Sequence, residues 1–203
     1  MSNLEEVAQQ VSVCTDCPLS KGRTKAVPGE GPADAEIMFI GEGPGFHEDQ
    51  QGRPFVGPAG QFLDQLIMSA GLKREEVFIA NVVKCRPPNN RDPLPGEIAA
   101  CRKHLDKQIE LINPKVVVTL GRYSMARFLP NQTIGKIRGR ARSVEGRLIY
   151  PMYHPAAALH NQNLRKVIEE DFKAIPGLVK QGAKETQPEE PSVQQLSMFS
   201  QDQ

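Results

Sequence analysis

Short apolar runs alternate with longer amphipathic stretches along the first 180 residues. Three runs are mostly apolar, at residues 36–41, 77–84 and 115–121, and the first and third end in glycine. Runs of this length, rich in Val and Ile, are typical of strands buried on both faces of a sheet. A fourth run, residues 147–153, leads directly into His154.

The stretches between these runs repeat apolar residues at spacings of three and four, which predicts amphipathic helices. The apolar stripes run from Phe62 to Ala70, from Ile98 to Ile112 and from Leu164 to Ile175. Alternation of strands and helices favours a mainly parallel sheet that is covered by helices. Ligands of such sheets bind at the carboxyl ends of the strands.

The periodic pattern stops near residue 180, and the tail, residues 181–203, is rich in Gln, Glu, Pro and Ser. Such a composition buries too little apolar surface to order a chain, so we expect the tail to be disordered. The whole chain has a net charge of +1, from 25 basic and 24 acidic residues. The tail holds one basic and four acidic residues, so residues 1–180 carry a net charge of +4.

The apolar runs are far shorter than the ~20 residues that cross a membrane. The first ten residues include two glutamates and no apolar core, so we expect no signal peptide. The sequence thus favours a cytoplasmic protein in a reducing compartment, where structural disulfides are rare.

Four cysteines therefore need another explanation. Cys14 and Cys17 form a C-x2-C pair, and Cys85 and Cys101 follow later in the chain. Four thiolates are a ligand set for zinc or for a [4Fe–4S] cluster, and the spacing does not separate the two. Cys101 alone is equally consistent with simple burial, because it lies on an apolar helix stripe. We expect His104, three residues later, to be solvated.

Polar and glycine-rich segments follow the predicted strands. Residues 41–45 read GEGPG, a loop whose glycines allow close approach of a ligand to the backbone, although a plain turn has the same composition. Asn81 lies within an apolar run, either as a structural hydrogen-bonding group or as an amide that reads a base edge. Pro155 holds His154 extended at a strand end. Phe55, in a Gly- and Pro-rich loop, is either a core anchor or a stacking platform.

Five cations occur within residues 136–147: Lys136, Arg138, Arg140, Arg142 and Arg147. At alternate positions of a strand, several of them would share one face. The strip is either a solvated strand edge that blocks aggregation or a surface that contacts phosphates.

Taken together, four segments resemble family 4, the iron–sulfur enzymes, of the uracil-DNA glycosylase superfamily. They are GEGPG at 41–45, GRPFVGPAG at 52–60, NVVKCRPPNNR at 81–91 and HPAAAL at 154–159, with the four cysteines in order. The resemblance covers about residues 10–178. It implies a three-layer α/β/α fold with a four-stranded, mainly parallel central sheet. It also implies a structural [4Fe–4S] cluster on Cys14, Cys17, Cys85 and Cys101.

The resemblance implies a monofunctional glycosylase that flips uracil out of single- or double-stranded DNA and starts base excision repair. Phe55 would stack on uracil, Asn81 would read its N3–H and O4 edge, and the Gly43 backbone would contact it closely. His154 would hydrogen-bond uracil O2, where negative charge develops as the glycosidic bond breaks.

This sequence departs from better-known superfamily members at the residue that positions the attacking water. Gly43 replaces their aspartate, and Glu42 precedes it. Glu42 either orients the water or only organises the loop together with Glu48 and Asn90. The His-containing insertion of covalent-trapping relatives is absent, so we expect no stable adduct.

The resemblance also suggests residues that contact DNA outside the pocket. Leu159 and Leu164 are alternative wedges that would fill the helix behind the flipped base. Arg138 and Arg140 would contact the backbone.

The tail contains Gln195–Phe199, which resembles a peptide that binds the bacterial sliding clamp. We expect an otherwise monomeric enzyme. Two alternatives stay open from the sequence: a catalytically weak damage-binding module, and a zinc-stabilised nucleotide-binding protein.

Overall fold

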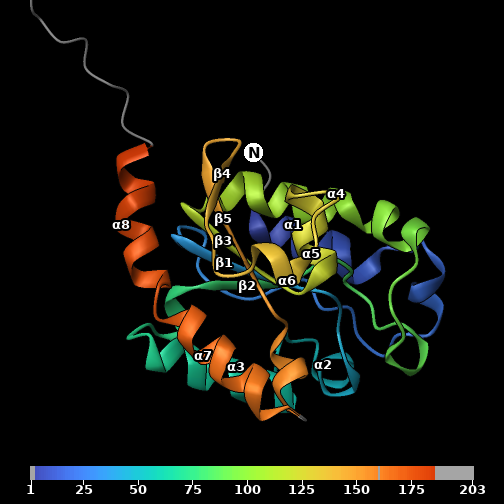
Figure 1. Cartoon of the computed structure of the whole chain (residues 1–203). Coiled ribbons are helices and arrows are strands. Elements are labelled where there is room, and N and C mark those ends of the chain that lie inside the picture. The colour runs from blue at the N-terminus through green and yellow to red at the C-terminus, as the bar shows by residue number, and fades with distance from the viewer. Residues whose placement is uncertain (1–2, 160, 186–203) are drawn as a thin grey trace, which may run out of the picture.

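The computed structural model describes residues 3–159 and 161–185. Its centre is a sheet with the strand order β2-β1-β3-β5-β4 (Figure 1). The strands are β1 (Ile37–Gly41), β2 (Phe78–Asn81), β3 (Val116–Leu120), β4 (Arg142–Val144) and β5 (Arg147–Met152). β2, β1, β3 and β5 run parallel to their neighbours, and β4 pairs antiparallel with β5.

The sheet therefore has five strands, and the prediction of four is wrong by one edge strand. Glu145 and Gly146 both take positive φ, of 52° and 75°, and turn the chain back between β4 and β5. A two-residue turn with this geometry matches the twist of a hairpin. The exposed, charged sequence of β4 lacked the apolar signature that revealed the other strands.

The same hairpin divides the cationic strip. Lys136 lies in the short helix α6 (Ile134–Ile137), Arg142 in β4 and Arg147 in β5. The five cations consequently do not alternate along a single strand.

Helices cover both faces of the sheet, so the fold has three layers, α/β/α (Figure 1). They are α1 (Leu4–Val13), α2 (Phe46–Gln51), α3 (Pro58–Ser69), α4 (Pro95–Ile112), α5 (Arg122–Phe128), α7 (Gln162–Phe172) and α8 (Ile175–Glu185). Short 3-10 turns are η1 (Pro18–Lys21), η2 (Arg74–Glu76), η3 (Pro88–Asn90) and η4 (Pro155–Ala158). α3 and α7 lie on one side of the sheet, and α4, with α1 packed against it, lies on the other (Figure 1).

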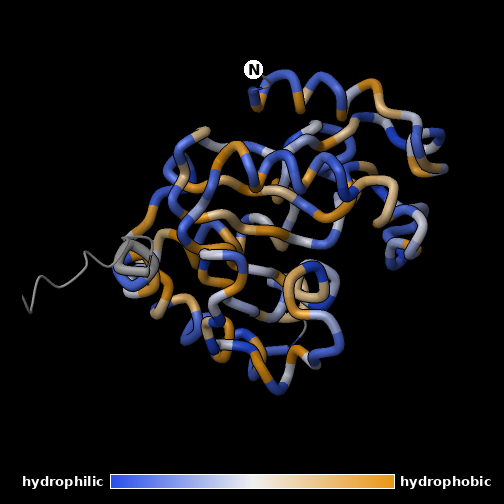
Figure 2. The backbone as a smooth tube through the Cα atoms, turned by 90° about the horizontal axis from the view of Figure 1, so that it is seen from above, coloured by the Kyte–Doolittle hydropathy of each residue, from blue (hydrophilic) through white to orange (hydrophobic). Residues whose placement is uncertain are grey.

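Alternate strand residues feed two hydrophobic cores, because successive side chains of a strand point to opposite faces. Phe39 belongs to the core under α3 and α7, where its ring stacks on that of Phe172 at 5.7 Å. Met38 and Ile40 belong to the core under α4. The apolar strands accordingly run through the middle of the molecule, with polar helix faces outside (Figure 2).

The C-terminal boundary differs from the predicted one. Helix α8 continues to Glu185, so the prediction of disorder is wrong for residues 181–185. The rest of the tail, with Gln195–Phe199, lies outside the described residues. No helix in the part of the chain that the structure describes is long and apolar enough to span a bilayer.

Candidate functional site

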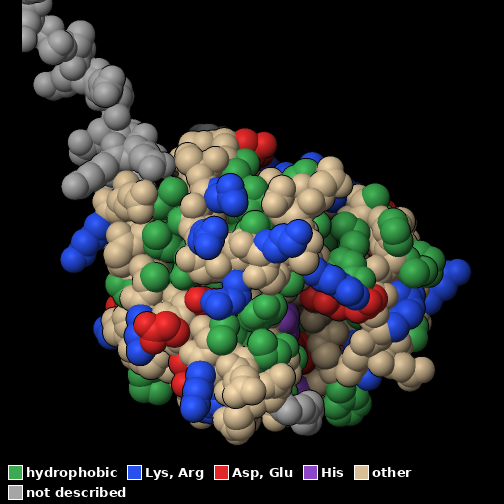
Figure 3. All heavy atoms as spheres, in the orientation of Figure 1, with side chains coloured by type: hydrophobic (Ala, Val, Ile, Leu, Met, Phe, Trp, Pro, Cys, Tyr) green, Lys and Arg blue, Asp and Glu red, His purple; other side chains and the backbone are tan. Residues whose placement is uncertain are grey.

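A cavity of about 540 Å³ opens where the chain leaves the carboxyl ends of β1, β2 and β5. The loop after β1 contributes Glu42 and Gly43, β2 contributes Asn81, and the segment after β5 contributes His154 and Leu159. Figure 3 shows the hollow from outside, with histidine beside it. The sequence argument had placed ligands at these strand ends, and this cavity lies there.

Asn81 forms the floor of this cavity. Its side chain is 2% exposed, and its Oδ1 atom has no hydrogen-bond partner among the described residues. Gly41, which pairs with Asn81 across the sheet, makes room for the amide. A Cβ atom at Gly41 would lie 2.4 Å from Asn81 Oδ1 and 2.6 Å from Phe55 Cζ. The amide oxygen is thus a buried acceptor without a partner in a residue that lines the cavity, which favours the ligand-reading alternative over a structural hydrogen bond.

Phe55 forms one wall and is held in an uncommon conformation. Its φ is 50°, a left-handed value that costs a bulky residue energy. Arg74 donates hydrogen bonds to the carbonyl oxygens of Pro54 at 2.6 Å and Phe55 at 3.3 Å. Gly60 packs so closely that a Cβ there would lie 2.0 Å from the Phe55 carbonyl oxygen. These contacts fix the ring against the cavity.

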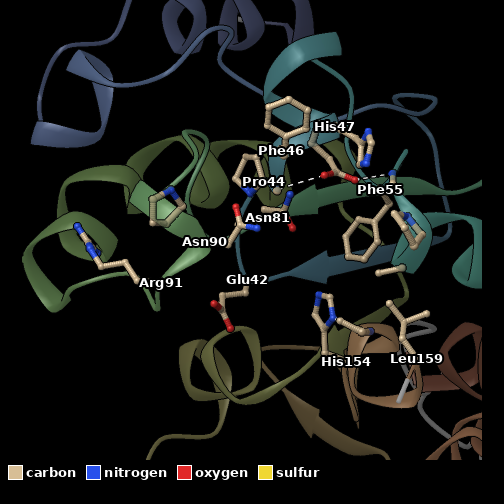
Figure 4. Close-up of a pocket in the computed structure, with 18 residues that line it drawn as sticks. Glu42, Pro44, Phe46, His47, Phe55, Asn81, Asn90, Arg91, His154 and Leu159 are labelled. Atoms are coloured by element: carbon tan, nitrogen blue, oxygen red, sulfur yellow. Dashed lines mark hydrogen bonds between the residues drawn. The ribbon is translucent and has the colours of Figure 1, made fainter. Parts of the chain in front are cut away.

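His154 stands opposite, with its ring centroid 5.5 Å from that of Phe55 and an interplanar angle of 25° (Figure 4). Its Nδ1 accepts a hydrogen bond from the backbone N–H of Ala156 at 3.1 Å. Burial lowers the pKa of His154 to about 4, and the negative charge of Glu48 opposes this only weakly. The ring is therefore neutral at pH 7, and with Nδ1 accepting, its proton belongs on Nε2.

Glu48, at the start of α2, joins the two loops that border the cavity. Its Oε1 accepts hydrogen bonds from the backbone N–H groups of Val56 and Gly57, each at 2.8 Å, and its Oε2 accepts one from that of Gly45 at 3.2 Å. Glu48, which the sequence suggested as a supporting residue, thus hydrogen-bonds to both loops. Asn90 also lines the cavity, but its described hydrogen bond is with Arg86, at 2.7 Å.

Glu42 lies at the edge of the cavity and is half-buried. Burial raises the pKa of its carboxyl group, and the nearby charge of Asp92 raises it further. Arg122 acts in the opposite direction on Glu42, and it forms an ion pair with Asp92. The site therefore holds a carboxyl group with an elevated pKa beside its amide and imidazole groups.

Two exposed apolar side chains stand on the rim. Leu159 is 41% exposed and lines the cavity, whereas Leu164 lies on α7 and is not among the described lining residues. Phe46 is 52% exposed, and the Arg86 guanidinium lies 5.2 Å from the centre of its ring. Sequence reasoning missed Phe46. Its position directly after GEGPG was the available signal.

The two arginines predicted to contact DNA differ in their surroundings. Arg138 donates to both carboxylate oxygens of Asp171, at 2.8 and 2.9 Å, and lies 5.8 Å from the centre of the Tyr153 ring. Its charge is therefore engaged within the protein. Arg140 is exposed.

A second, small cavity is lined by all four cysteines, from the segments after α1, after β2 and within α4. No disulfide joins them in the described part of the chain. Burial raises the pKa of the Cys101 thiol to about 11. Lys84 borders the same cavity, and burial lowers its pKa to about 8.

The donor set fits a group that is bound by soft sulfur ligands. Within residues 3–159 and 161–185, no three Cys, His, Asp or Glu side chains form a group suited to holding one metal ion. All four thiols line one cavity. His104 also lines this cavity and is only 4% exposed, so the expectation that it is solvated is wrong. It shares this cavity with Val11 of α1, which packs on α4.

Comparison with known proteins places the chain among enzymes of one kind. The sequence profile described as "Uracil DNA glycosylase superfamily" matches residues 28–174. The type-4 uracil-DNA glycosylase of Sulfurisphaera tokodaii is 52% identical over 185 residues, covering 86% of this chain and 84% of the relative. That of Saccharolobus solfataricus is 51% identical, covering 86% of each chain. That of Thermotoga maritima is 44% identical, covering 87% of this chain and 95% of the relative.

Proposed function

The chain belongs to the uracil-DNA glycosylase superfamily, and from this premise we propose that it excises uracil from DNA. It hydrolyses the N-glycosidic bond, leaves an abasic site and so initiates base excision repair. The observation that carries the proposal is the unpartnered Oδ1 of Asn81 at the floor of the cavity. A buried acceptor without a donor is costly unless a ligand supplies one, and uracil presents N3–H beside the O4 acceptor.

The remaining walls suit a flat, flipped-out base. The Phe55 ring offers a stacking surface. Gly43 lines the cavity with its backbone, and the packing of Val83 requires glycine there, because a Cβ would lie 2.7 Å from a methyl carbon of Val83. The cavity thus combines a stacking wall, a close backbone approach and an amide that reads the base edge.

His154 acts on the leaving group. Its neutral ring accepts the Ala156 N–H at Nδ1, which leaves Nε2–H to donate to uracil O2. Negative charge develops on O2 as the glycosidic bond breaks, so this hydrogen bond strengthens toward the transition state. Because the Ala156 N–H already holds Nδ1 of the neutral His154 ring, Nε2–H can donate to uracil O2 while the glycosidic bond breaks, and no proton has to be transferred.

Glu42 orients the water that attacks C1′ of the sugar. It is the carboxyl group that follows β1 directly, and it lies at the edge of the cavity rather than on its floor. Its raised pKa makes it a better hydrogen-bond acceptor from water than an ordinary glutamate at neutral pH. Leu159 is the wedge into the space left by the base, since it is exposed on the rim. Arg140 contacts the DNA backbone.

Cys14, Cys17, Cys85 and Cys101 hold a [4Fe–4S] cluster. Their common cavity and the soft sulfur donor set support this assignment. When bound, the cluster ties the segment after α1 to the segment between β2 and α4 and takes no part in the reaction. Absorbance near 400 nm, with iron and without zinc in the purified protein, tests the assignment. One zinc per chain without iron contradicts it.

The experiment that tests the function uses oligonucleotides with one uracil, single- and double-stranded, and matched strands with cytosine or thymine. The protein is added, abasic sites are cleaved with alkali and strand breaks are measured. We expect breaks only at uracil. Binding of uracil-containing strands without cleavage would instead favour the damage-binding module. We further propose that the enzyme acts as a cytoplasmic monomer on nucleoid DNA and binds the sliding clamp through Gln195–Phe199.

A further inference from the structure

The cysteine cavity is bordered by an arginine that links its two halves. Arg23 donates from Nη1 to the carbonyl oxygen of Cys14 at 2.8 Å and to Sγ of Cys85 at 3.1 Å. Its Nη2 donates to the carbonyl oxygen of Ser12 at 2.7 Å. The Arg23 guanidinium therefore connects the end of α1 to Cys85, which lies 62 residues after the arginine in the sequence. A guanidinium presents several donors in a fixed plane, which suits this three-way contact.

A lysine in the segment that follows β2 lines the same cavity. Lys84 is 1% exposed, and its backbone N–H donates to Sγ of Cys101 at 3.2 Å. Its Nζ donates to Oε1 of Gln108 at 2.7 Å. Gln108 in turn donates to the carbonyl oxygen of Pro28. These partners are all neutral, so they satisfy hydrogen bonds but do not balance a buried positive charge.

Carboxylates in the described structure do not supply the missing negative charge. Neither Arg23 nor Lys84 forms an ion pair with a carboxylate there, and Asp16, which lines the cavity, is paired with Lys103 at 2.5 Å. Buried charges persist when a counter-charge is close. The Arg23 guanidinium donates directly to Cys85 Sγ, and Lys84 lines the cavity together with the four cysteines.

We propose that Arg23 and Lys84 are positioning residues that form a cationic clamp for the thiolate-bound cluster. This inference rests on the cluster assignment made above and not on uracil excision. Four thiolates around a dipositive core leave a net charge of about −2, which two cations balance. Arg23 also holds the segment that bears Cys14 close to Cys85. Its removal should therefore make the positions of these two ligands less well defined and also remove a positive charge.

The clamp predicts two measurable properties. Loss of an N–H···S hydrogen bond and a positive charge lowers the reduction potential of a cluster, because the reduced form is the more negative one. Loss of a group that orients the ligands also weakens metal binding, typically by ~10- to 100-fold. Both effects concern the cluster itself and need no glycosylase assay.

The test compares Arg23→Gln, Arg23→Lys and Lys84→Met with the wild-type chain. Arg127→Gln is the control, because Arg127 is partly buried, as Arg23 is, but its partner is the carboxylate of Asp106 and it lines neither cavity. Decay of the absorbance near 400 nm is followed in air with an iron chelator, and the reduction potential is measured by spectroelectrochemistry. Circular dichroism establishes that each variant is folded.

We expect ~10-fold faster cluster loss in Arg23→Gln, an intermediate rate in Arg23→Lys and the wild-type rate in the control. The reduction potential should become more negative in both Arg23→Gln and Lys84→Met. A variant that fails to retain enough cluster for electrochemistry is compared by its iron content at purification. Wild-type decay rates and potentials in Arg23→Gln and Lys84→Met would overturn the clamp. A wild-type protein that lacks iron yet excises uracil would overturn the clamp and the cluster while leaving the proposed function intact.

Discussion

Replacing Asn81 with alanine separates the catalytic use of the buried amide from its structural use. The side chain is 2% exposed, and its Oδ1 has no partner in the described structure. An unsatisfied buried carbonyl costs about 1–3 kcal/mol, so its removal returns that free energy to the folded state. The packing lost with a small side chain is of similar size, about 1–2 kcal/mol. We therefore expect the free energy of unfolding of Asn81→Ala to lie within about 1 kcal/mol of wild type.

The effect on catalysis should be far larger. The amide offers uracil one acceptor and one donor in a water-poor cavity, and together these are worth about 3–5 kcal/mol to the bound base. At 1.36 kcal/mol for each factor of ten, kcat/KM should fall by about 10²- to 10⁴-fold. The assay is single-turnover excision from a uracil-containing strand, with denaturant unfolding measured on the same preparation.

Thr119→Val is the matched control. Thr119 is fully buried in β3, and its Oγ1 also has no partner in the described structure, but the residue does not line the cavity. Its replacement should preserve kcat/KM and leave stability unchanged or raised. A kcat/KM for Asn81→Ala within about threefold of wild type would refute the assignment of the amide to uracil. So would a large loss of stability in that variant, because the missing activity would then report unfolding.

Three further predictions concern the same chain. His154→Ala should lower kcat by about 10²- to 10³-fold with a small change in stability, measured by the same two assays. Because burial lowers the pKa of His154 to about 4 from 6.5, the unfolded chain binds a proton more readily between these values. As pH decreases from 6.5 to 4, the stability of the wild type should therefore fall by up to about 3 kcal/mol more than that of His154→Ala. Excision should decline as pH falls through the raised pKa of Glu42 and should be slow and pH-independent in Glu42→Gln, as rates between pH 4 and 8 will show. Removal of residues 190–203 should leave excision from short oligonucleotides intact and abolish binding to the sliding clamp in a titration.

The strands with strong apolar signatures were predictable, and they position the site. β1, β2, β3 and β5 each contain a run of buried residues, and each run was recognised from its composition. Parallel strands between helices end at one edge, so Asn81 and His154 could be expected near the loop that contains Glu42. Because of this topology, Glu42, Asn81 and His154 line the same cavity.

Features that depend on charge were harder to foresee. β4 is exposed and carries Arg142, so its composition resembles that of a loop. It is a strand because the turn at Glu145 and Gly146 brings it back to pair with β5. The sequence suggested that Arg138 contacts phosphate. In the structure its guanidinium hydrogen-bonds to Asp171, which lies 33 residues later in the chain. His104 looked solvated because the sequence of α4 does not show which of its faces α1 covers.

The sequence by itself determined the secondary-structure plan, the ligand types and the edge of the sheet where chemistry gathers, because hydrophobic periodicity and strand-end residues are local properties of the chain. Only the tertiary structure decided which groups have partners. It leaves the Asn81 carbonyl unpaired, directs the His154 proton to Nε2 and sets Arg23 against Cys85. Hydrogen bonds and ion pairs depend on distances of about 3 Å between residues remote in sequence, and those distances exist only once the sheet and its helices have packed.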